Sequence, residues 1–117
     1  LFEVLDRVYR DYKPPAIIIS ENGASYSDGP DATGKVHDQK RVDYLRDHLL
    51  ALWQAISSGI PVTGYYAWSL MDNFEWSLGY SQRFGIVHVD YATQKRTPKD
   101  SALWYSQVSS QNGISIK

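Results

Sequence analysis

The sequence predicts an α/β fold with a parallel β-sheet. Helix and strand patterns alternate along the chain, in the order helix, strand, helix, strand, helix, which is typical of βα units. The first expected strand, residues 16–19, is a continuous apolar run of the kind found in strands that are covered on both faces. Because two such strands leave their outer edges unpaired, we expect the chain to be a slice of a larger sheet.

The composition excludes several classes of protein. The chain has 117 residues, a formal net charge of -1, 43% hydrophobic residues and no cysteine. These values exclude a disulfide scaffold, a zinc–thiolate centre and a basic nucleic-acid binder. No stretch approaches the ~20 apolar residues of a membrane span, so we expect neither a membrane nor a nucleic acid as partner. Four Trp and nine Tyr predict a large core or an aromatic-lined pocket.

The length predicts one domain over residues 1–117, without a separate second domain. The chain starts without Met and inside a helical pattern, so we expect an upstream part of the protein to be missing. The absence of cysteine favours a cytoplasmic location.

The first helix is expected over residues 1–12. It should end at Lys13, because Pro14 and Pro15 cannot donate to a helix. The polar residues 25–36, with two Gly and a Pro, are expected to form a loop after the strand at 16–19. The apolar stripe of the helix consists of Leu1, Leu5, Val8, Tyr9 and Tyr12.

A long helix is expected over residues 38–58. Asp38 is the predicted N-cap, Gly59 occupies the position where a left-handed residue closes a helix, and Pro61 follows. The predicted apolar stripe of this helix consists of Val42, Leu45, Leu49, Leu52, Trp53 and Ile56.

Three further elements complete the predicted chain. A second buried strand runs from residue 62 to about residue 70, and residues 84–91 form a short strand. Thr97 is expected to cap the final helix and Pro98 to occupy its first turn. That helix contains Leu103 and Trp104, and residues 111–117 form a polar tail.

Glu21 is the first candidate for chemistry. It ends a buried strand and is followed by Asn22 and Gly23. Active sites of parallel α/β folds form at this end of the strands, where an apolar strand can desolvate a carboxylate into a nucleophile or an acid/base group. The alternative is a loop carboxylate that caps the next element, and position alone slightly favours that alternative.

The end of the second strand strengthens the case for a site. Trp68, Phe74 and Trp76 surround it, and indole faces suit the apolar face of a sugar ring. The alternative is that these three rings are simply core. Polar side chains among the rings count against that alternative, since buried polar groups need partners. They are Asp72, Asn73 and Glu75.

The remaining polar candidates lack a chemical pattern. The three histidines, at positions 37, 48 and 88, show no metal-ligand spacing and are interpreted as structural. A solvent-exposed basic face is expected from Lys95, Arg96 and Lys99.

Three motifs give the sequence a family resemblance. They are Ile18-Ile19-Ser20-Glu21-Asn22-Gly23, then Tyr66-Ala67-Trp68-Ser69-Leu70-Met71-Asp72-Asn73-Phe74-Glu75-Trp76, then Arg83-Phe84-Gly85-Ile86. In this order the chain resembles family 1 glycoside hydrolases, the β-glucosidase family. The resemblance covers nearly the whole chain and implies the C-terminal part of a (βα)8 TIM barrel, about strands 7 and 8 with their helices.

The same resemblance implies roles for five residues. Glu21 matches the catalytic nucleophile, and Trp68 matches the platform beneath the glycone ring. Glu75 and Trp76 match groups that bind the glycone hydroxyls, and Phe84 matches an aromatic of the pocket wall. The acid/base glutamate of the family lies in an Asn-Glu-Pro context that is absent here.

The implied activity is retaining hydrolysis of terminal β-linked sugars, with a β-glucoside or related β-glycoside as substrate. It requires no metal or organic cofactor, and it needs the N-terminal part of the same barrel as a partner. Two alternatives stay open. The chain could belong to a catalytically silent sugar-binding protein, although Glu21 counts against this, or it could be a structural fragment that complements a partner chain.

Overall fold

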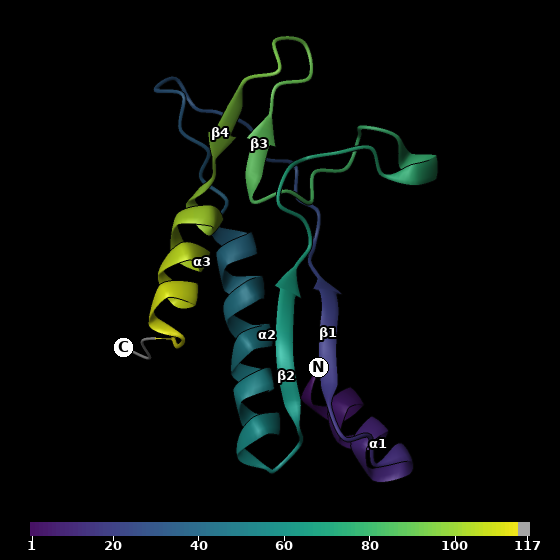
Figure 1. Ribbon diagram of the computed structural model, residues 1–117. Helices are drawn as coiled ribbons and strands as arrows, with labels where there is room; N and C mark the ends of the chain where they lie inside the picture. The colour runs from purple at the N-terminus through teal and green to yellow at the C-terminus, as the bar shows by residue number, and fades with distance from the viewer. Residues whose placement is uncertain (115–117) are drawn as a thin grey trace.

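The computed structural model describes residues 1–114 (Figure 1). Helices and strands alternate over the first half of the chain, and an antiparallel hairpin precedes the last helix. The elements are α1 (Phe2–Tyr12), β1 (Ile17–Asn22), α2 (Gln39–Ser57), β2 (Val62–Ala67), the short 3-10 helix η1 (Trp76–Leu78), β3 (Val87–Val89), β4 (Arg96–Pro98) and α3 (Asp100–Gln111).

Strands β1 and β2 pair in parallel, with α2 as the crossover between them. Ile17 lies opposite Val62, and Ile19 lies opposite Tyr65. A parallel pair needs a crossover of this length, because a tight turn would reverse the chain. The predicted α/β architecture with parallel strands is therefore confirmed.

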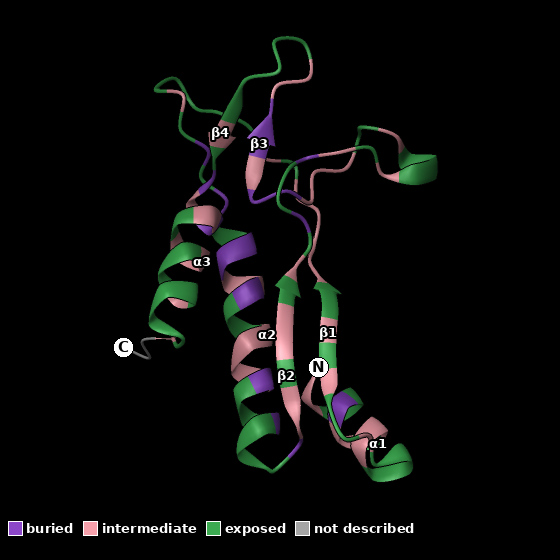
Figure 2. Ribbon diagram, viewed as in Figure 1, coloured by how far each residue is buried: buried purple, intermediate pink, exposed green. Residues whose placement is uncertain are grey.

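The helices cover one face of this two-stranded sheet. Leu5 of α1 and Leu52 and Ala55 of α2 form the buried core together with Ile60. One face of the sheet packs against this cluster, through Ile17, Ile19, Val62 and Tyr65. The described chain measures 48 × 37 × 19 Å. Figure 2 shows buried residues on α1 and α2, whereas neither strand of this sheet is buried along its length.

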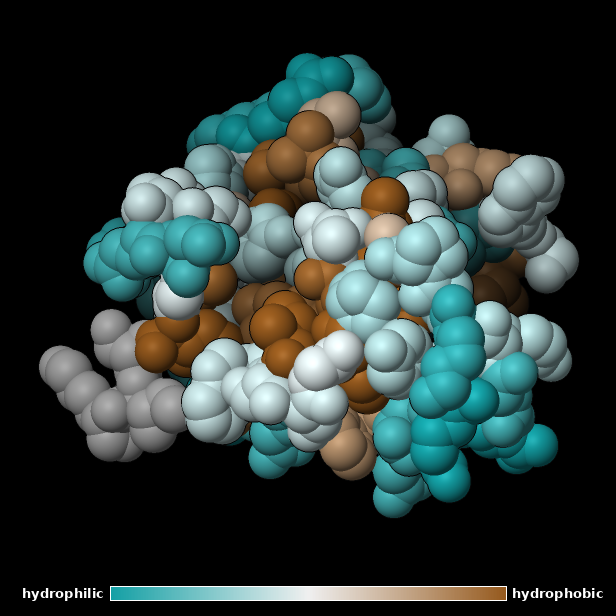
Figure 3. Space-filling model, turned by 60° about the horizontal axis from the view of Figure 1, so that its bottom comes forward, coloured by the Kyte–Doolittle hydropathy of each residue, from teal (hydrophilic) through white to brown (hydrophobic). Residues whose placement is uncertain are grey.

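The opposite face of the sheet is uncovered in the described chain. Ile18 is 59% exposed and Tyr66 is 62% exposed. Within residues 1–114 no second layer packs on this face, as expected for a chain that is a slice of a larger sheet. Figure 3 shows apolar side chains between polar ones on the surface as well. The apolar composition of the strands is explained only if another layer covers this face.

Helix α2 begins and ends close to its expected bounds, and Gly59 follows it with a left-handed φ of 86°. Its predicted buried face is partly wrong. Trp53 is 60% exposed and Ile56 is 47% exposed, whereas Ala55 is fully buried, because the small side chain faces the sheet. No helix within residues 1–114 has both the length and the apolar content to cross a bilayer.

The start of the last helix differs from the prediction. Thr97 and Pro98 do not open it: both lie in β4, where Thr97 pairs with His88 and Pro98 with Val87. The helix begins at Asp100 after Lys99. Pairing with β3 keeps this segment extended. The Thr-Pro pattern favours a helix start locally, but the strand pairing is a tertiary contact that overrides this local preference. Of the polar tail expected over 111–117, Gln111 lies in α3 and residues 112–114 follow the helix, whereas residues 115–117 lie outside the described part.

Candidate active site

The site is built where β1 and β2 end side by side. Asn22 lies opposite Ala67, and the main-chain N–H of Trp68 donates to the carbonyl oxygen of Asn22 at 2.8 Å. Gly23 packs against the same turn so closely that a Cβ atom there would lie 1.7 Å from the carbonyl oxygen of Trp68. The carboxyl ends of the two strands therefore form one continuous edge, which is where ligands bind in parallel α/β folds.

A bulge near the end of β1 changes the direction of its side chains. Three steps along β1, from Ile19 to Asn22, oppose two steps along β2, from Tyr65 to Ala67. Bulges of this kind re-aim side chains and are frequent beside active sites.

The bulge turns Asn22 toward the helices and Glu21 away from them, the reverse of what regular alternation after Ile19 would give. The Asn22 amide faces the helices, where its Nδ2 donates to Tyr44 Oη of α2 at 3.2 Å and its Oδ1 accepts from Tyr65 Oη at 2.8 Å. Glu21 is exposed, and within residues 1–114 its carboxylate has no hydrogen bond or ion pair. Glu21 is thus not used to cap the next element. Its carboxylate stays available at the strand edge.

Trp68 and Phe84 lie at the same edge. Trp68 follows β2 directly and is 39% exposed. Ser69, the next residue, donates from its N–H to the carbonyl oxygen of Phe84 at 3.1 Å and accepts from the N–H of Ile86 at 2.9 Å. The structure therefore brings together three of the five predicted residues: Glu21, Trp68 and Phe84.

Glu75 and Trp76 lie further away, on the loop between β2 and β3. Figure 1 shows this loop reaching out to the side, with η1 near its tip. The N–H of Glu75 donates to the carbonyl oxygen of Gly79 at 2.7 Å, which closes the tip as a tight turn. Trp76 is 82% exposed, and in the described chain neither side chain contacts Glu21 through a hydrogen bond or ion pair.

Asp72, at the base of that loop, binds protein groups instead of solvent. Its carboxylate accepts from Arg83 Nη1 at 2.6 Å, from Lys99 Nζ at 3.0 Å and from the N–H of Gly85 at 3.0 Å. Burial raises the pKa of Asp72, but the hydrogen bonds from Arg83 and Lys99 outweigh it, and the pKa lies below its usual value. Asp72 is therefore an ionised structural carboxylate.

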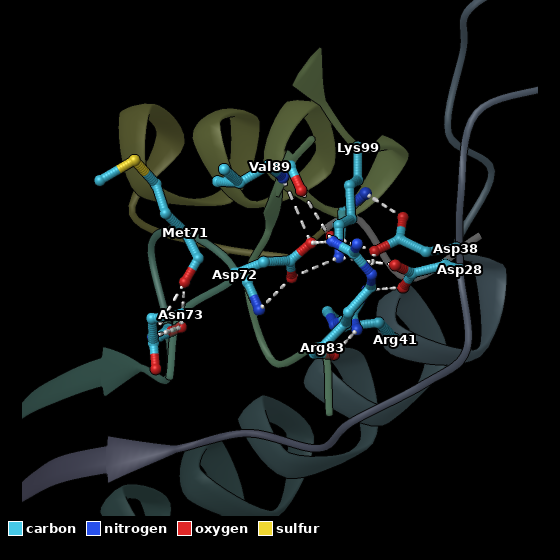
Figure 4. A network of polar contacts seen from close by, with 12 residues as sticks. Asp28, Asp38, Arg41, Met71, Asp72, Asn73, Arg83, Val89 and Lys99 are labelled. Atoms are coloured by element: carbon cyan, nitrogen blue, oxygen red, sulfur yellow. Dashed lines mark hydrogen bonds and ion pairs between the residues drawn. The ribbon is translucent and has the colours of Figure 1, made fainter. Parts of the chain in front are cut away.

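Lys99 links Asp72 to the loop that follows Glu21 (Figure 4). Its ammonium lies 3.0 Å from Asp72 and 2.7 Å from Asp28, and the side chain is completely buried. The prediction that Lys99 belongs to a solvent-exposed basic face is thus wrong. Lys95 and Arg96 are exposed as expected.

The network continues to the start of α2. Arg41 donates to Asp28 at 2.5 Å and also to Asp38, and Arg41 Nη2 donates to the carbonyl oxygen of Arg83 at 2.7 Å. Asp38 does not cap its own helix: its Oδ1 accepts from the N–H of Ser101 at 2.8 Å, and its Oδ2 accepts from the hydroxyl. The position of Asp38 before the helix is as predicted, but its carboxylate binds α3.

These network residues were not predicted as a group. Arg41 offered a signal, because it lies one turn after Asp38 and beside the apolar stripe of the helix, where a cation needs a partner. Asp28 and Lys99 pair with each other across 71 positions of sequence, and no local pattern indicates this contact.

The histidines make contacts of ordinary structural kinds. His37 lies between Asp100 and Asp31, at 2.7 Å and 3.3 Å, and His48 stacks on Tyr44. Burial lowers the pKa of His88. Across residues 1–114, we find no group of three or more His, Asp or Glu residues arranged to hold a metal ion.

A carboxylate and aromatic side chains at the carboxyl ends of parallel strands place the chain among α/β folds whose ligand sites form at these strand ends. Residues 1–114 match the model of glycosyl hydrolase family 1. The chain belongs to this family.

Curated relatives and solved structures agree with this membership. The chain is 53% identical over 114 residues to β-glucosidase A of Thermotoga maritima, an alignment that covers 97% of this chain. The structure of a family 1 β-glucosidase from the same organism superimposes with a TM-score of 0.97 at 52% identity over 98% of the chain. The complex of the T. maritima enzyme with deoxynojirimycin gives a TM-score of 0.96 at 53% identity over 97% of the chain.

The chain is much shorter than these relatives. It spans 26% of the length of the T. maritima β-glucosidase and the same share of each of the two solved chains. Its fold is accordingly a segment of the family 1 TIM barrel.

Proposed function

We propose that this chain supplies the nucleophile Glu21 and four sugar-binding residues of a retaining β-glycosidase of the β-glucosidase type. The observation that supports the proposal most is the placement of Glu21. The bulge at the end of β1 leaves its carboxylate free at the strand edge beside Trp68, on the side away from the helices. The relatives named as β-glucosidases support the choice of substrate.

In the proposed reaction, Glu21 attacks the anomeric carbon and forms a covalent glycosyl-enzyme. A second carboxylic acid, ~5–5.5 Å away, protonates the leaving oxygen and later deprotonates the attacking water. The chain has only two other glutamates, Glu3 on α1 and Glu75 in the proposed sugar site, and no Asn-Glu-Pro tripeptide. We therefore place the acid/base residue in the part of the barrel that precedes this chain.

The proposed glycone site uses the edge and the projecting loop. Trp68 offers an indole face to the apolar side of the sugar ring, and Phe84 forms part of the wall. Glu75 accepts hydrogen bonds from the outer hydroxyls, and Trp76 donates one. The deoxynojirimycin complex of the T. maritima enzyme supports a sugar-shaped ligand for this fold.

We propose that β1 and β2 are strands 7 and 8 of the barrel and that the N-terminal part covers their open face. The exposed Ile18 and Tyr66 and the unpaired outer edges of the two strands support this placement. Closing the sheet into a barrel removes such edges. The single domain of residues 1–117 is then the C-terminal part of the catalytic domain.

The test compares the chain alone with the complete barrel. We expect residues 1–117 alone to unfold without a sharp transition and not to hydrolyse an aryl β-glucoside, because an uncovered sheet face and a missing proton donor remain. Combined with the N-terminal part, the chain should hydrolyse it, and NMR should show the β-anomer of the sugar as the first product. An α-anomer formed first would contradict the retaining mechanism. A complete barrel that binds deoxynojirimycin without turnover would favour the silent sugar-binding alternative.

A further inference from the structure

Two loops carry the proposed site, and one buried side chain joins them. The loop after β1 follows Glu21 and contains Asp28, and the loop after β2 contains Asp72 and Glu75. We propose that Lys99 is a positioning residue. It fixes the loop after β2, which carries Glu75 and is called the sugar-binding loop below, relative to β1, which carries Glu21. This inference rests on the proposed function, because it assigns Lys99 a role in binding the same sugar.

The position of Lys99 suits this role. Its ammonium lies 2.7 Å from Asp28 Oδ1 and 3.0 Å from Asp72 Oδ1 with no exposed surface (Figure 4). Its main chain is held as well, since its N–H donates to the carbonyl oxygen of Ile86 at 2.9 Å and it bridges to Val36. The cation is therefore anchored by the backbone and reaches both loops at once.

Asp72 connects Lys99 to the sugar-binding loop. It lies at the neck of the loop, where its own N–H donates to the carbonyl oxygen of Val87 at 3.0 Å. Gly85 forms the other side of the neck, and a Cβ atom there would lie 2.1 Å from the nitrogen of Asp72. The neck has no spare room, so a displacement of Asp72 must move the segment that begins with Asn73 and carries Glu75.

Asp28 connects the same cation to the rigid scaffold. Its second oxygen accepts from Arg41 of α2, and Arg41 is held by Asp38. Arg41, Lys99 and Asp38 are almost fully buried. A carboxylate fixed between two buried cations gives the loop after Glu21 a defined position relative to α2.

Charge balance explains why replacing Lys99 by an apolar side chain should displace the two loops that it joins. The network contains three carboxylates and three cations: Asp28, Asp38, Asp72, Arg41, Arg83 and Lys99. Without the ammonium, the carboxylates of Asp28 and Asp72 face each other across a buried site. Like charges repel strongly there, and Arg41 and Arg83 alone must then balance three carboxylates, which leaves one buried negative charge uncompensated. Both loops then shift, and a displacement of ~1 Å at a site is enough to weaken its function about a hundred-fold.

The experiment is a double-mutant cycle in the complete barrel with Lys99→Met and Glu75→Ala. The readouts are KM and kcat for an aryl β-glucoside and the dissociation constant of deoxynojirimycin. We expect Lys99→Met to weaken deoxynojirimycin binding about ten-fold when Glu75 is present and less than about two-fold when it is absent. Equal losses in both backgrounds would overturn the proposal, because Lys99 would then not act through the loop that carries Glu75.

A matched control separates positioning from stability. Leu52→Ala removes core volume on α2 away from both loops, so it should lower the melting temperature while KM and inhibitor binding stay unchanged. If Leu52→Ala raises KM as much as Lys99→Met at equal loss of stability, the proposal is wrong. Should Lys99→Met not fold, Asp72→Asn takes its place in the cycle, with the same expected non-additivity.

The failure of this inference is distinguishable from the failure of the proposed function. An unmutated barrel that neither hydrolyses the β-glucoside nor binds deoxynojirimycin contradicts the function itself. An active unmutated barrel with additive effects of Lys99→Met and Glu75→Ala contradicts the positioning role alone.

Discussion

Gly23 and Trp68 are in main-chain contact: a Cβ atom on Gly23 would lie 1.7 Å from the carbonyl oxygen of Trp68. The main chains that leave β1 after Glu21 and β2 at Trp68 are therefore packed directly against each other. The residue two positions after Glu21 has to be glycine because of this packing, since no side chain of any size fits.

Gly23→Ala should disable the site. The clash forces the two strand ends apart, and we expect a loss of about 1–3 kcal/mol in stability. The displacement of Glu21 should lower kcat/KM about a hundred-fold. Gly29→Ala is the matched control, because nothing lies within 4 Å of a Cβ atom there. Activity assays and thermal unfolding of the two variants in the complete barrel check this, and equal effects of both would contradict the assigned packing.

Glu75 should select neutral sugars. If its carboxylate accepts from the outer hydroxyls of the glycone, Glu75→Ala removes hydrogen bonds to a charged group and should lower kcat/KM about ten- to a hundred-fold. A phosphate on the 6-position would bring like charges together, so the unmutated enzyme should hydrolyse a 6-phospho-β-glucoside poorly. Glu3→Ala on α1 is the control. Equal or better hydrolysis of the phosphorylated substrate would show that this role of Glu75 is wrong.

Asp38 should be far more important for stability than its place before a helix suggests. Asp38→Ala removes one of the two carboxylate partners of the buried Arg41 and the acceptor for Ser101 in α3, and breaking a buried ion pair costs about 3–5 kcal/mol. Asp43→Ala, on the exposed side of the same helix, should change stability by less than about 1 kcal/mol. Denaturant unfolding of both variants in the complete barrel measures the difference. Similar values for the two would refute the structural role of the network.

His37 should make stability depend on pH. The hydrogen bond to Asp100 is the main cause that raises the pKa of His37, and Asp31 adds to it. The side-chain hydrogen bond from Thr33 lowers the pKa of Asp31 to about 2, so Asp31 stays ionised. A raised folded-state pKa stabilises the fold fully below the unfolded value of ~6.5, and this contribution disappears as the pH rises through the folded value.

We therefore expect His37→Gln to lower the melting temperature at pH 5 and to have little effect at pH 9. The effect should be small, because the site is exposed to solvent. Melting curves of the complete barrel at the two pH values check this. A larger effect at pH 9 than at pH 5 would contradict the assignment.

The local patterns predicted the elements that local forces determine. The apolar run at residues 16–19, the helical periodicity of α2 and the left-handed Gly59 all depend on nearby residues, and the structure has them in place. The parallel pairing followed from the same alternation. The position of Glu21 at the carboxyl end of a strand could also be predicted, because polar residues follow the apolar run directly, although the strand itself continues to Asn22.

The predictions that the structure contradicts failed because of contacts between residues distant in sequence. Thr97 and Pro98 carry a helix-start signal, but pairing with β3 keeps them extended. Lys99 looks like a surface cation until Asp28 and Asp72, distant in sequence, enclose it. The bulge at the end of β1, which turns Asn22 toward the helices and Glu21 away from them, depends on the register with β2 and has no local signature.

The role of Glu21 is tested most directly by Glu21→Ala in the complete barrel, with azide as a substitute nucleophile. Glu3→Ala, which removes a carboxylate from exposed α1, is the control and should keep full activity. Loss of the covalent route should lower kcat by about a thousand-fold or more. Azide should then restore turnover of an activated aryl β-glucoside and yield the α-glycosyl azide, because the small anion occupies the vacated space and attacks from the same side. Full activity of Glu21→Gln, or a β-configured azide product, would contradict the assignment of Glu21 as the nucleophile.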